Sequence, residues 1–343
     1  MFDLDSLIRE NIKKLKPYSS ARDEFDGSKG VFLDANENPY GTYNRYPDPY
    51  QRELKAKIAK IKRVNADHVF IGNGSDEVID LLYRIFCAPG ADKALTFSPS
   101  YGMYDVSAGI NDVELMKLPL TDSFQLDQDS IHETLTLESI KLIFICSPNN
   151  PTGNTIESGS IENLLSEAEG IVVIDEAYID FSNNESWTKR LDEFSNLIVI
   201  QTMSKAWGLA GVRLGLAFSS PQIIQYLNKV KPPYNISSPN QEAGLEAITN
   251  IDKFQAEIDA ILSEKKRMAQ ELETMNTIKK IYPSDANFLL VEVEDADSLY
   301  NKLVQQLVII RNRNKDVTNC LRITVGTPEE NNELLDQLRN LAK

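Results

Sequence analysis

Residues 197–218 read LIVIQTMSKAWGLAGVRLGLAF, two apolar runs that enclose one lysine, Lys205, and one arginine, Arg213. The runs, at 197–200 and 214–218, have the composition and length of buried strands. A lysine is almost never fully buried unless it is paired. Lys205 therefore either reaches solvent from a loop or has a partner inside the fold, and the rest of the chain must decide between these interpretations.

Five more short apolar runs precede this segment and alternate with helix-period segments. That alternation is typical of an α/β sheet with crossover helices. One helix is expected to begin at Ser75 and Asp76, because the residues that follow place their apolar side chains on one face. We predict one mostly parallel seven-stranded sheet flanked by helices, with strands at 69–71, 94–97, 113–118, 142–146, 171–174, 197–200 and 214–218.

The pattern of apolar and charged residues along the chain changes after about residue 235. A long charged helical stretch is followed by the strand-like runs ANFLLVEV and CLRITVG. We therefore predict a large domain at 41–235 and a smaller α+β domain at 236–343, with residues 1–40 as an N-terminal arm that packs with the small domain.

Composition excludes several classes of partner. The chain has 343 residues, with 36 basic and 51 acidic side chains and a formal net charge of −15, so it offers no basic field for nucleic acid or an anionic membrane. No segment approaches the apolar length of a membrane span, and the N-terminus lacks the apolar stretch of a signal peptide. Any anionic ligand must be held by local groups.

The cysteines and histidines argue against a disulfide framework, a metal site and a histidine-based catalytic triad. Cys87, Cys146 and Cys320 are widely spaced, which favours reduced, packed thiols and a cytoplasmic protein over a disulfide framework or a metal cluster. His68 and His132 are the only histidines and stand in polar surroundings. The sequence therefore predicts no metal site and no Ser-His-Asp triad.

Three apolar runs, KLIFIC, IVVI and LIVI, are each followed directly by polar residues. The carboxyl ends of parallel strands lie at one edge of a sheet, where ligands bind. Those ends carry Asn150, then Asp175 with Tyr178, then Ser204 with Lys205. Each alone is explained as a turn or cap residue, but their order and shared location indicate one cleft.

The cleft would place the amine of Lys205 opposite the carboxylate of Asp175, without a metal or a histidine base. This arrangement suits pyridoxal phosphate, because the cofactor's aldehyde condenses with a lysine and its ring nitrogen pairs with an acid.

A glycine turn, IGNGSDE at 71–77, joins a predicted strand to a predicted helix. Free backbone N–H groups and the positive end of the helix dipole can bind a phosphate there. The turn lacks the glycine spacing of a Rossmann loop and the Gly-Lys-Ser/Thr of a P-loop. A plain glycine turn with a serine cap explains it equally well.

The motifs SPNNPTG, DEAY and TMSKAWGLAGVRLG together resemble the motif series of the fold-type I pyridoxal-phosphate-dependent aminotransferases of class I/II. Within that family, LDANENPYG, NRYPDP, GNGSDE, PSYGMY and CLRITVGT resemble the histidinol-phosphate aminotransferase subfamily. The match runs in order from about Leu33 to about Thr327. It implies the fold-type I architecture and a pyridoxal 5′-phosphate cofactor.

The resemblance also implies roles for individual residues. Lys205 would be the Schiff-base lysine, Asp175 the partner of the pyridinium nitrogen, and Tyr178 the third catalytic residue. Asn150 and Tyr178 would bond the ring hydroxyl, and Tyr101 would stack on the ring. The cofactor phosphate would be held by Ser75, Asp76, Thr202, Ser204 and Arg213.

Further implied residues concern the substrate and a second subunit. Arg322 matches the arginine that binds the substrate carboxylate, and Arg311 falls where the subfamily places a second anion-binding arginine, two residues before Arg313. Tyr40 and Asn150 would also contact the substrate. Tyr46 would reach the cofactor phosphate of the neighbouring subunit, which implies a homodimer.

The implied reaction moves an amino group between L-glutamate/2-oxoglutarate and L-histidinol phosphate/imidazole-acetol phosphate, a step of histidine biosynthesis. Another class I/II aminotransferase, aromatic or broad-range, or a threonine-phosphate decarboxylase would share the cofactor residues and differ around Tyr40, Arg311 and Arg322. A nucleotide-binding α/β protein that uses the 71–77 turn would leave the three strand-end motifs unexplained. A regulator that binds pyridoxal phosphate would need a separate DNA-binding domain, for which the chain has no room.

Overall fold

The structure, a computed structural model, describes residues 3–18 and 30–341. All seven predicted strands of the main sheet are present, in the order β1-β7-β6-β5-β4-β2-β3. Only β7 runs antiparallel to its neighbours, and the other pairs in the sheet are parallel. The strands are β1 (Val69–Asn73), β2 (Lys93–Ser98), β3 (Glu114–Pro119), β4 (Ile140–Cys146), β5 (Ile171–Asp175), β6 (Leu197–Thr202) and β7 (Leu214–Phe218).

Strand register brings the polar strand ends together. Cys146, the last residue of β4, is paired with Asp175, the last residue of β5, and Asp175 is paired with Ile200 in β6. The residues that follow these three strands therefore leave the sheet at one edge. The mostly parallel sheet predicted from the sequence is confirmed.

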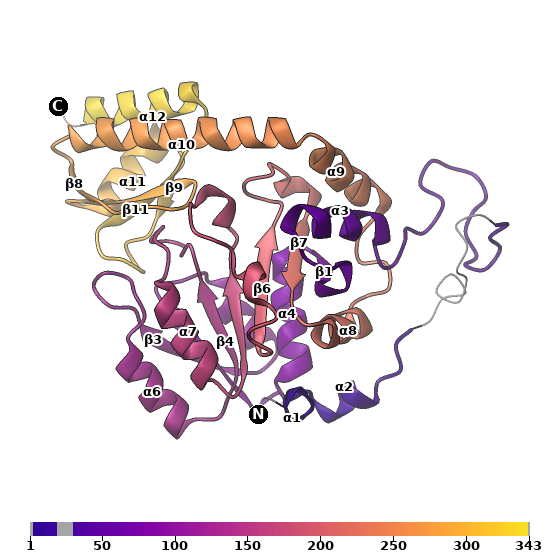
Figure 1. The fold of residues 1–343 in the computed structure, drawn as a ribbon. Helices are drawn as coiled ribbons and strands as arrows, with labels where there is room; N and C mark the ends of the chain where they lie inside the picture. The colour runs from indigo at the N-terminus through magenta and orange to yellow at the C-terminus, as the bar shows by residue number, and fades with distance from the viewer. Residues whose placement is uncertain (1–2, 19–29, 342–343) are drawn as a thin grey trace.

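Helices cover both faces of this sheet, as Figure 1 shows. Buried strands are apolar on both faces: in β5, Val172 and Ile174 join one core, and Ile171 and Val173 join the other. The first core includes residues of α3 (Arg52–Lys62), α6 (Gln128–Leu137) and α7 (Ser158–Glu167). The second includes residues of α4 (Ser75–Phe86), α5 (Met103–Ile110) and α8 (Pro221–Val230).

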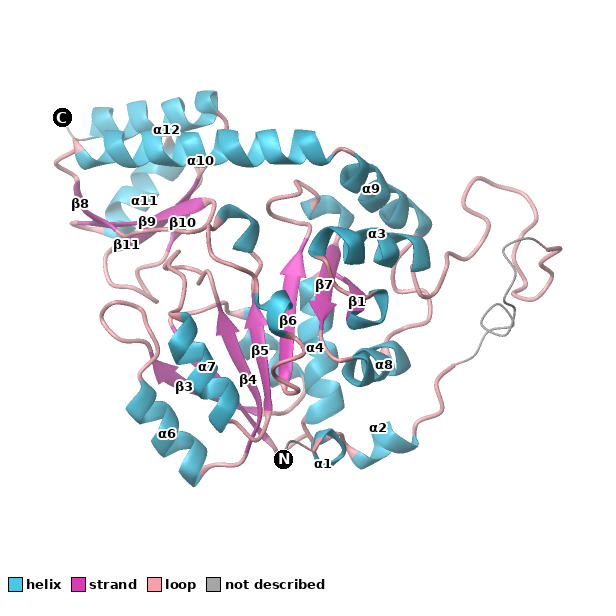
Figure 2. Cartoon of the chain, in the orientation of Figure 1, coloured by secondary structure: helices cyan, strands magenta, loops and turns pink. Residues whose placement is uncertain are grey.

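A smaller α+β unit follows α9 (Ser238–Thr249) and has its own core. Its antiparallel sheet has the order β10-β11-β9-β8 and lies beneath two helices in Figure 2. Its strands are β8 (Ile278–Ile281), β9 (Phe288–Val293), β10 (Arg311–Asn312) and β11 (Cys320–Thr324), and its helices are α10 (Ile251–Glu273), α11 (Ala296–Gln305) and α12 (Pro328–Leu341).

Helix α10 joins the two units. Ile258, in its first half, packs in a cluster with Tyr178 and Phe181 from the loop after β5, whereas Met268 and Leu272, in its second half, belong to the core of the small unit. A single 23-residue helix thus fixes the small unit above the carboxyl edge of the large sheet. The domain boundary at 235/236 stays a prediction.

The expected position of the N-terminal arm is wrong for its first described part. Helices α1 (Leu4–Leu7) and α2 (Glu10–Lys14) place Leu7, Ile8 and Ile12 in the core formed with α4 and α8, not against the small unit. The backbone N–H of Arg9 also donates to the carbonyl of Ile85 at 3.1 Å. Apolar side chains of the arm close the edge of the large core. Residues 1–2 and 19–29 of the arm lie outside the described residues.

The three cysteines are free and buried, which confirms the prediction of packed thiols. Within residues 3–18 and 30–341, no helix is both long and apolar enough to cross a bilayer. The same residues contain no group of three or more His, Cys, Asp or Glu side chains placed to hold a metal ion.

Candidate active site

A cavity of about 490 Å³ opens at the carboxyl edge of the main sheet, beneath the small unit. Parallel α/β sheets bind ligands at this edge. Most of the predicted site residues line this cavity. Its lining consists of Ser75, Asp76, Tyr101, Gly102, Met103, Val106, Cys146, Asn150, Asp175, Ala177, Tyr178, Thr202, Ser204, Lys205, Arg213, Arg311, Arg313 and Arg322.

Lys205 extends into this cavity from the loop between β6 and β7. The loop is closed by two backbone hydrogen bonds, from Met203 N–H to the Leu214 carbonyl at 2.9 Å and from Gly208 N–H to the Lys205 carbonyl at 3.2 Å. The Lys205 Nζ lies 5.9 Å from the centroid of the Tyr178 ring. Loss of hydration lowers the pKa of the amine, and the charge of Arg322 lowers it further. A lysine so placed has a larger fraction of the neutral, nucleophilic amine.

Asp175 lies at the floor of the cavity and is almost completely buried. Its Oδ2 accepts a hydrogen bond from the Tyr104 hydroxyl at 2.8 Å, and its Oδ1 accepts one from the Ala177 N–H at 3.1 Å. Burial raises its pKa to about 6, against the opposing effect of the Tyr104 hydrogen bond. No lysine or arginine of the described residues lies within ion-pair distance of Asp175. Buried charges are normally paired, so this carboxylate suits a cationic ligand group.

Asn150 connects the floor of the cavity to the small unit. Its Nδ2 donates to the Tyr178 hydroxyl at 3.4 Å, and its Oδ1 accepts from Arg322 Nη1 at 2.5 Å and from Arg313 Nη2 at 3.2 Å. Because the two guanidinium groups occupy Oδ1, the amide presents its N–H₂ group to the cavity side that Tyr178 lines. Burial raises the pKa of Tyr178, so its hydroxyl stays protonated.

The start of α4 forms the opposite end of the cavity. No side chain caps this helix, so its first N–H groups are left for a ligand. Arg213 Nη2 lies 3.2 Å from Asp76 Oδ2, and the Tyr101 hydroxyl donates to Asp76 Oδ1 at 3.0 Å. Ser204 N–H donates to Thr202 Oγ1 at 3.1 Å beside them.

The glycine turn before α4 is shaped by Arg213. Gly74 has a φ of +79°, and a Cβ at this position would lie 2.4 Å from Arg213 Nη2. Glycine adopts this conformation without strain and lets the guanidinium lie against the backbone. Arg213, the first N–H groups of α4 and nearby hydroxyls thus meet at the turn predicted as a possible phosphate site, and together they suit a phosphate group.

Two predicted site residues lie outside the cavity. Tyr40 is 82% exposed, and Tyr46 is half-exposed with its ring stacked on Tyr234 at a centroid distance of 4.4 Å. Neither belongs to the cavity lining of its own chain.

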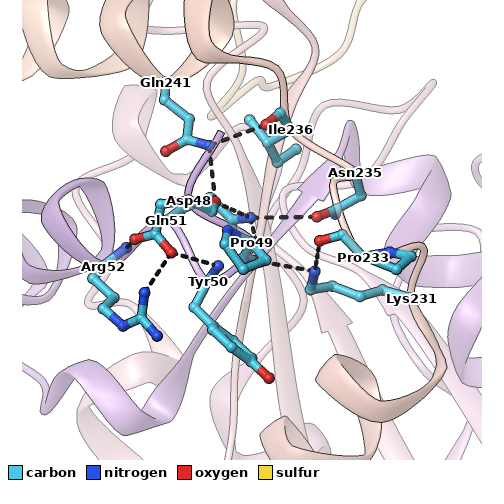
Figure 3. Close-up of polar contacts among 10 residues, drawn as sticks. All are labelled: Asp48, Pro49, Tyr50, Gln51, Arg52, Lys231, Pro233, Asn235, Ile236 and Gln241. Atoms are coloured by element: carbon cyan, nitrogen blue, oxygen red, sulfur yellow. Dashed lines mark hydrogen bonds and ion pairs between the residues drawn. The ribbon is translucent and has the colours of Figure 1, made fainter. Parts of the chain in front are cut away.

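Just after Tyr46, a network of polar contacts holds the chain in place (Figure 3). The buried Lys231 donates to the carbonyls of Pro49 and Pro233, both at 2.8 Å, and Gln241 donates to the carbonyl of Asp48 at 3.2 Å. The network ties the start of α3 to the segment that leads from α8 to α9.

Sequence reasoning missed Tyr104 and did not select Arg313. Tyr104 is fully buried, and its ring stacks on Phe144 at a centroid distance of 4.9 Å. The spacing of Tyr101 and Tyr104, three residues apart at the start of a helix, would place both rings on the same side. That spacing was the available signal for Tyr104.

Comparison with known proteins identifies the family. The profile of the family described as "Aminotransferase class I and II" matches residues 25–338. This protein belongs to the class I and II aminotransferases. The histidinol-phosphate aminotransferase of Parabacteroides distasonis is 52% identical over 344 residues, which cover 99% of each chain.

Two solved structures share the fold of this aminotransferase. The histidinol-phosphate aminotransferase of Clostridium acetobutylicum has a TM-score of 0.80 at 24% identity, over 88% of this chain and 91% of that one. The enzyme of Sinorhizobium meliloti, solved in complex with pyridoxal-5′-phosphate, has a TM-score of 0.79 at 21% identity over 90% of each chain. The predicted fold type is confirmed. Pyridoxal phosphate is the cofactor of the class I and II aminotransferases, which also confirms the predicted cofactor.

Proposed function

We propose that this aminotransferase moves an amino group between L-glutamate/2-oxoglutarate and L-histidinol phosphate/imidazole-acetol phosphate. The observation that carries the proposal is a cavity with an anion-binding group at each end and Lys205 and Asp175 between them. The relatives that are about half identical in sequence carry the name of this activity. We also propose that the enzyme is cytoplasmic, because free buried cysteines suit a reducing compartment.

The residues around the cavity fit pyridoxal phosphate. Ser75, Asp76, Thr202, Ser204 and Arg213 would hold its phosphate at the start of α4. Asp175 would pair with its ring nitrogen, Asn150 and Tyr178 would bond its ring oxygen, and Tyr101 would cover one ring face. When bound, the cofactor supplies an electron sink for the carbon that carries the amino group.

The protein's own groups supply binding and proton transfer. Lys205 holds the cofactor through its amine and then acts as a general acid–base at the substrate α-carbon, for which a lowered pKa is suitable. Asp175 fixes the ring and keeps a negative charge beside the ring nitrogen. Arg322 binds the substrate carboxylate, and Arg311 and Tyr40 contribute to anion binding near the cavity mouth.

The same proposal includes a homodimer in which Tyr46 reaches the cofactor phosphate of the neighbouring subunit. Tyr46 supports it by lying outside the cavity of its own chain. Val31, Leu33 and Tyr43, on the same segment, are 70–89% exposed. Exposed apolar side chains that gather in one region commonly mark a protein interface.

An absorbance experiment tests the reaction. The visible band of the lysine-bound cofactor should bleach when L-histidinol phosphate is added alone and return when 2-oxoglutarate follows. The Lys205→Ala variant, which lacks the amine, should show neither the band nor turnover. A band that ignores histidinol phosphate but bleaches with another amine would assign the protein to a sister activity, such as an aromatic aminotransferase.

A further inference from the structure

A short segment of the small unit holds the loop that carries Asn150. The segment, residues 284–286, lies just before β9, and the Asn150 loop, residues 149–155, follows β4. The Asp285 N–H donates to the Gly153 carbonyl at 2.7 Å, and Asp285 Oδ2 accepts from Thr155 Oγ1 at 2.6 Å and from Thr155 N–H at 3.3 Å. One residue thus makes three hydrogen bonds between the two units.

The segment and the loop also fit closely in shape. Gly153 has a φ of +85°, and a Cβ at this position would lie 2.6 Å from Ser284 Oγ. Glycine adopts this conformation without strain and leaves room for the serine. Ser284 Oγ donates to the Phe288 carbonyl at 2.6 Å, so it would lose a bond at the start of β9 if it moved aside. The glycine is therefore needed where the segment packs on the loop.

The segment is fixed in turn by the helix that joins the two units. Lys265, in the second half of α10, donates to the carbonyls of Ser284 at 2.8 Å and Ala286 at 2.7 Å. The two carbonyls flank Asp285, whose side chain points to the loop. The place of Asp285 is thus set from the small-unit side, and the loop is held against it.

Hydrogen bonds within the Asn150 loop transmit this contact to Asn150. Gly153 N–H donates to the Asn149 carbonyl at 2.8 Å, and Asn149 N–H donates to the Asn154 carbonyl at 2.8 Å. The Asn149 side chain donates to Thr152 Oγ1 at 2.7 Å. Asn150 is buried within this closed loop. A displacement of Gly153 should therefore displace Asn150 as well.

Asp285 does not line the cavity, so its effect on a bound cofactor passes through the loop. We propose that Asp285 is a positioning residue: by holding the loop at Gly153 and Thr155, it keeps the N–H₂ group of Asn150 beside the ring oxygen of pyridoxal phosphate. The inference rests on the proposed role of Asn150 and adds the residue that sets its place. The same contact makes the position of that amide depend on the position of the small unit.

The charge of the ring oxygen gives a readout that needs no substrate. In the lysine-bound cofactor, the Lys205 nitrogen shares its proton with this oxygen. A hydrogen bond from Asn150 stabilises the negative charge of the oxygen and makes it a weaker acceptor for that proton. Loss of the bond should therefore raise the pKa of the lysine-bound cofactor by about 1. A change in fold stability alone would leave this pKa where it is.

Absorbance of the holoenzyme as a function of pH measures this pKa. Asp285→Ala, which removes the acceptor oxygens, should raise it by about 1, and Thr155→Val, which removes the hydroxyl donor, should shift it in the same direction. Asp285→Asn keeps one acceptor oxygen and should restore most of the wild-type value. The matched control is Asp295→Ala, because Asp295 accepts from the Ser298 N–H at 2.9 Å at the start of α11 and does not touch the loop. This control should lose similar stability and keep the wild-type pKa.

Hydrogen exchange in the cofactor-free protein tests the contact by itself. Amides of residues 149–155 should exchange about tenfold faster in Asp285→Ala and Thr155→Val than in the wild type or Asp295→Ala. If Asp285→Ala does not fold, Thr155→Val serves for both measurements.

Three outcomes decide between the explanations. Faster exchange with an unchanged pKa would show that Asp285 holds the loop without placing Asn150, which overturns the proposal. An unchanged pKa in Asn150→Ala would overturn it together with the proposed role of Asn150. The expected pKa changes in a protein that ignores histidinol phosphate would support the inference and refute only the proposed function.

Discussion

The buried pair of Tyr104 and Asp175 sets the charge at the floor of the site. Asp175 is useful to a cationic ring nitrogen only when it is ionised, yet burial alone favours its neutral form. The hydrogen bond from Tyr104 opposes burial and lowers the pKa of Asp175 toward about 6. Tyr104 is thus a positioning residue, because it affects the cofactor through Asp175.

Removal of this hydrogen bond predicts a pH-dependent loss of cofactor affinity. In the wild type, affinity should fall as the pH drops through about 6, because Asp175 becomes neutral. In Tyr104→Phe the pKa of Asp175 is higher, so the fall should begin at higher pH, with affinity about tenfold weaker near pH 7. Fluorescence titration of the cofactor-free protein with pyridoxal phosphate at several pH values measures the change.

The control for that titration is Asp175→Asn. This variant should bind the cofactor weakly and lack the pH step that belongs to Asp175, although steps due to the cofactor's own groups remain. If Tyr104→Phe and the wild type lose affinity at the same pH, the hydrogen bond does not set the charge of Asp175.

Residues that directly follow strands were predictable, whereas residues placed by tertiary contacts were not. Asp175 ends β5, and Asn150 and Lys205 lie in the loops that follow β4 and β6. The ends of parallel strands share one edge of the sheet whatever the rest of the fold does. Tyr104 acts from inside α5, where an apolar ring on a helix is ordinary core. The choice between Arg311 and Arg313 depends on a two-residue strand, β10, which no periodicity reveals.

At the scale of elements, the network around Lys231 connects the start of α3 with the segment between α8 and α9. The buried ammonium group donates to the carbonyls of Pro49, Pro232 and Pro233, and proline-rich segments offer carbonyls without N–H groups to pair with them. Tyr46 and Tyr234, which stack on each other, belong to the two segments that it joins. The network thus supports the proposed intersubunit tyrosine.

Lys231→Met should destabilise the fold by about 3 kcal/mol, because the buried carbonyl of Pro49 and the partly buried bonds to the Pro232 and Pro233 carbonyls lose a charged donor while the methionine fills similar volume. Lys229→Met is the matched control, since Lys229 donates to the Lys13 carbonyl from a partly exposed position and its loss should cost at most about 1 kcal/mol. Urea unfolding of the cofactor-free proteins gives both values. Equal stability of the two variants would show that the Lys231 contacts do not hold these segments together.

The arm shows why packing between elements was harder to predict than the elements themselves. Helices α1 and α2 have four and five residues, too few for their apolar pattern to indicate which unit they cover. Their place on the large core depends on an apolar surface that α4 and α8 create together. The seven strands of the main sheet, in contrast, are marked by their own short, largely apolar runs.

At the scale of the whole molecule, the proposed homodimer makes each site depend on two chains. Lys205 would act in its own subunit and Tyr46 in the neighbouring one. A Lys205→Ala subunit would therefore still donate an intact Tyr46 to its partner. Tyr46→Phe keeps the ring for its stack on Tyr234 but lacks the hydroxyl, so its homodimer should need more cofactor for activity.

Mixed dimers of these two variants distinguish a shared site from a self-contained one. If Tyr46 acts across the interface, every mixed dimer has one site with both groups intact and one site with neither. Random pairing of equal amounts makes half of the dimers mixed, so about a quarter of wild-type activity should return at limiting pyridoxal phosphate. If Tyr46 acts in its own subunit, each site of a mixed dimer keeps one defect and activity should stay at the mean of the two parent variants. Co-expression of the two chains with different affinity tags separates these outcomes. Purification through both tags leaves only mixed dimers, which should then have about half of wild-type activity if Tyr46 acts across the interface and the mean of the two parent variants if it does not.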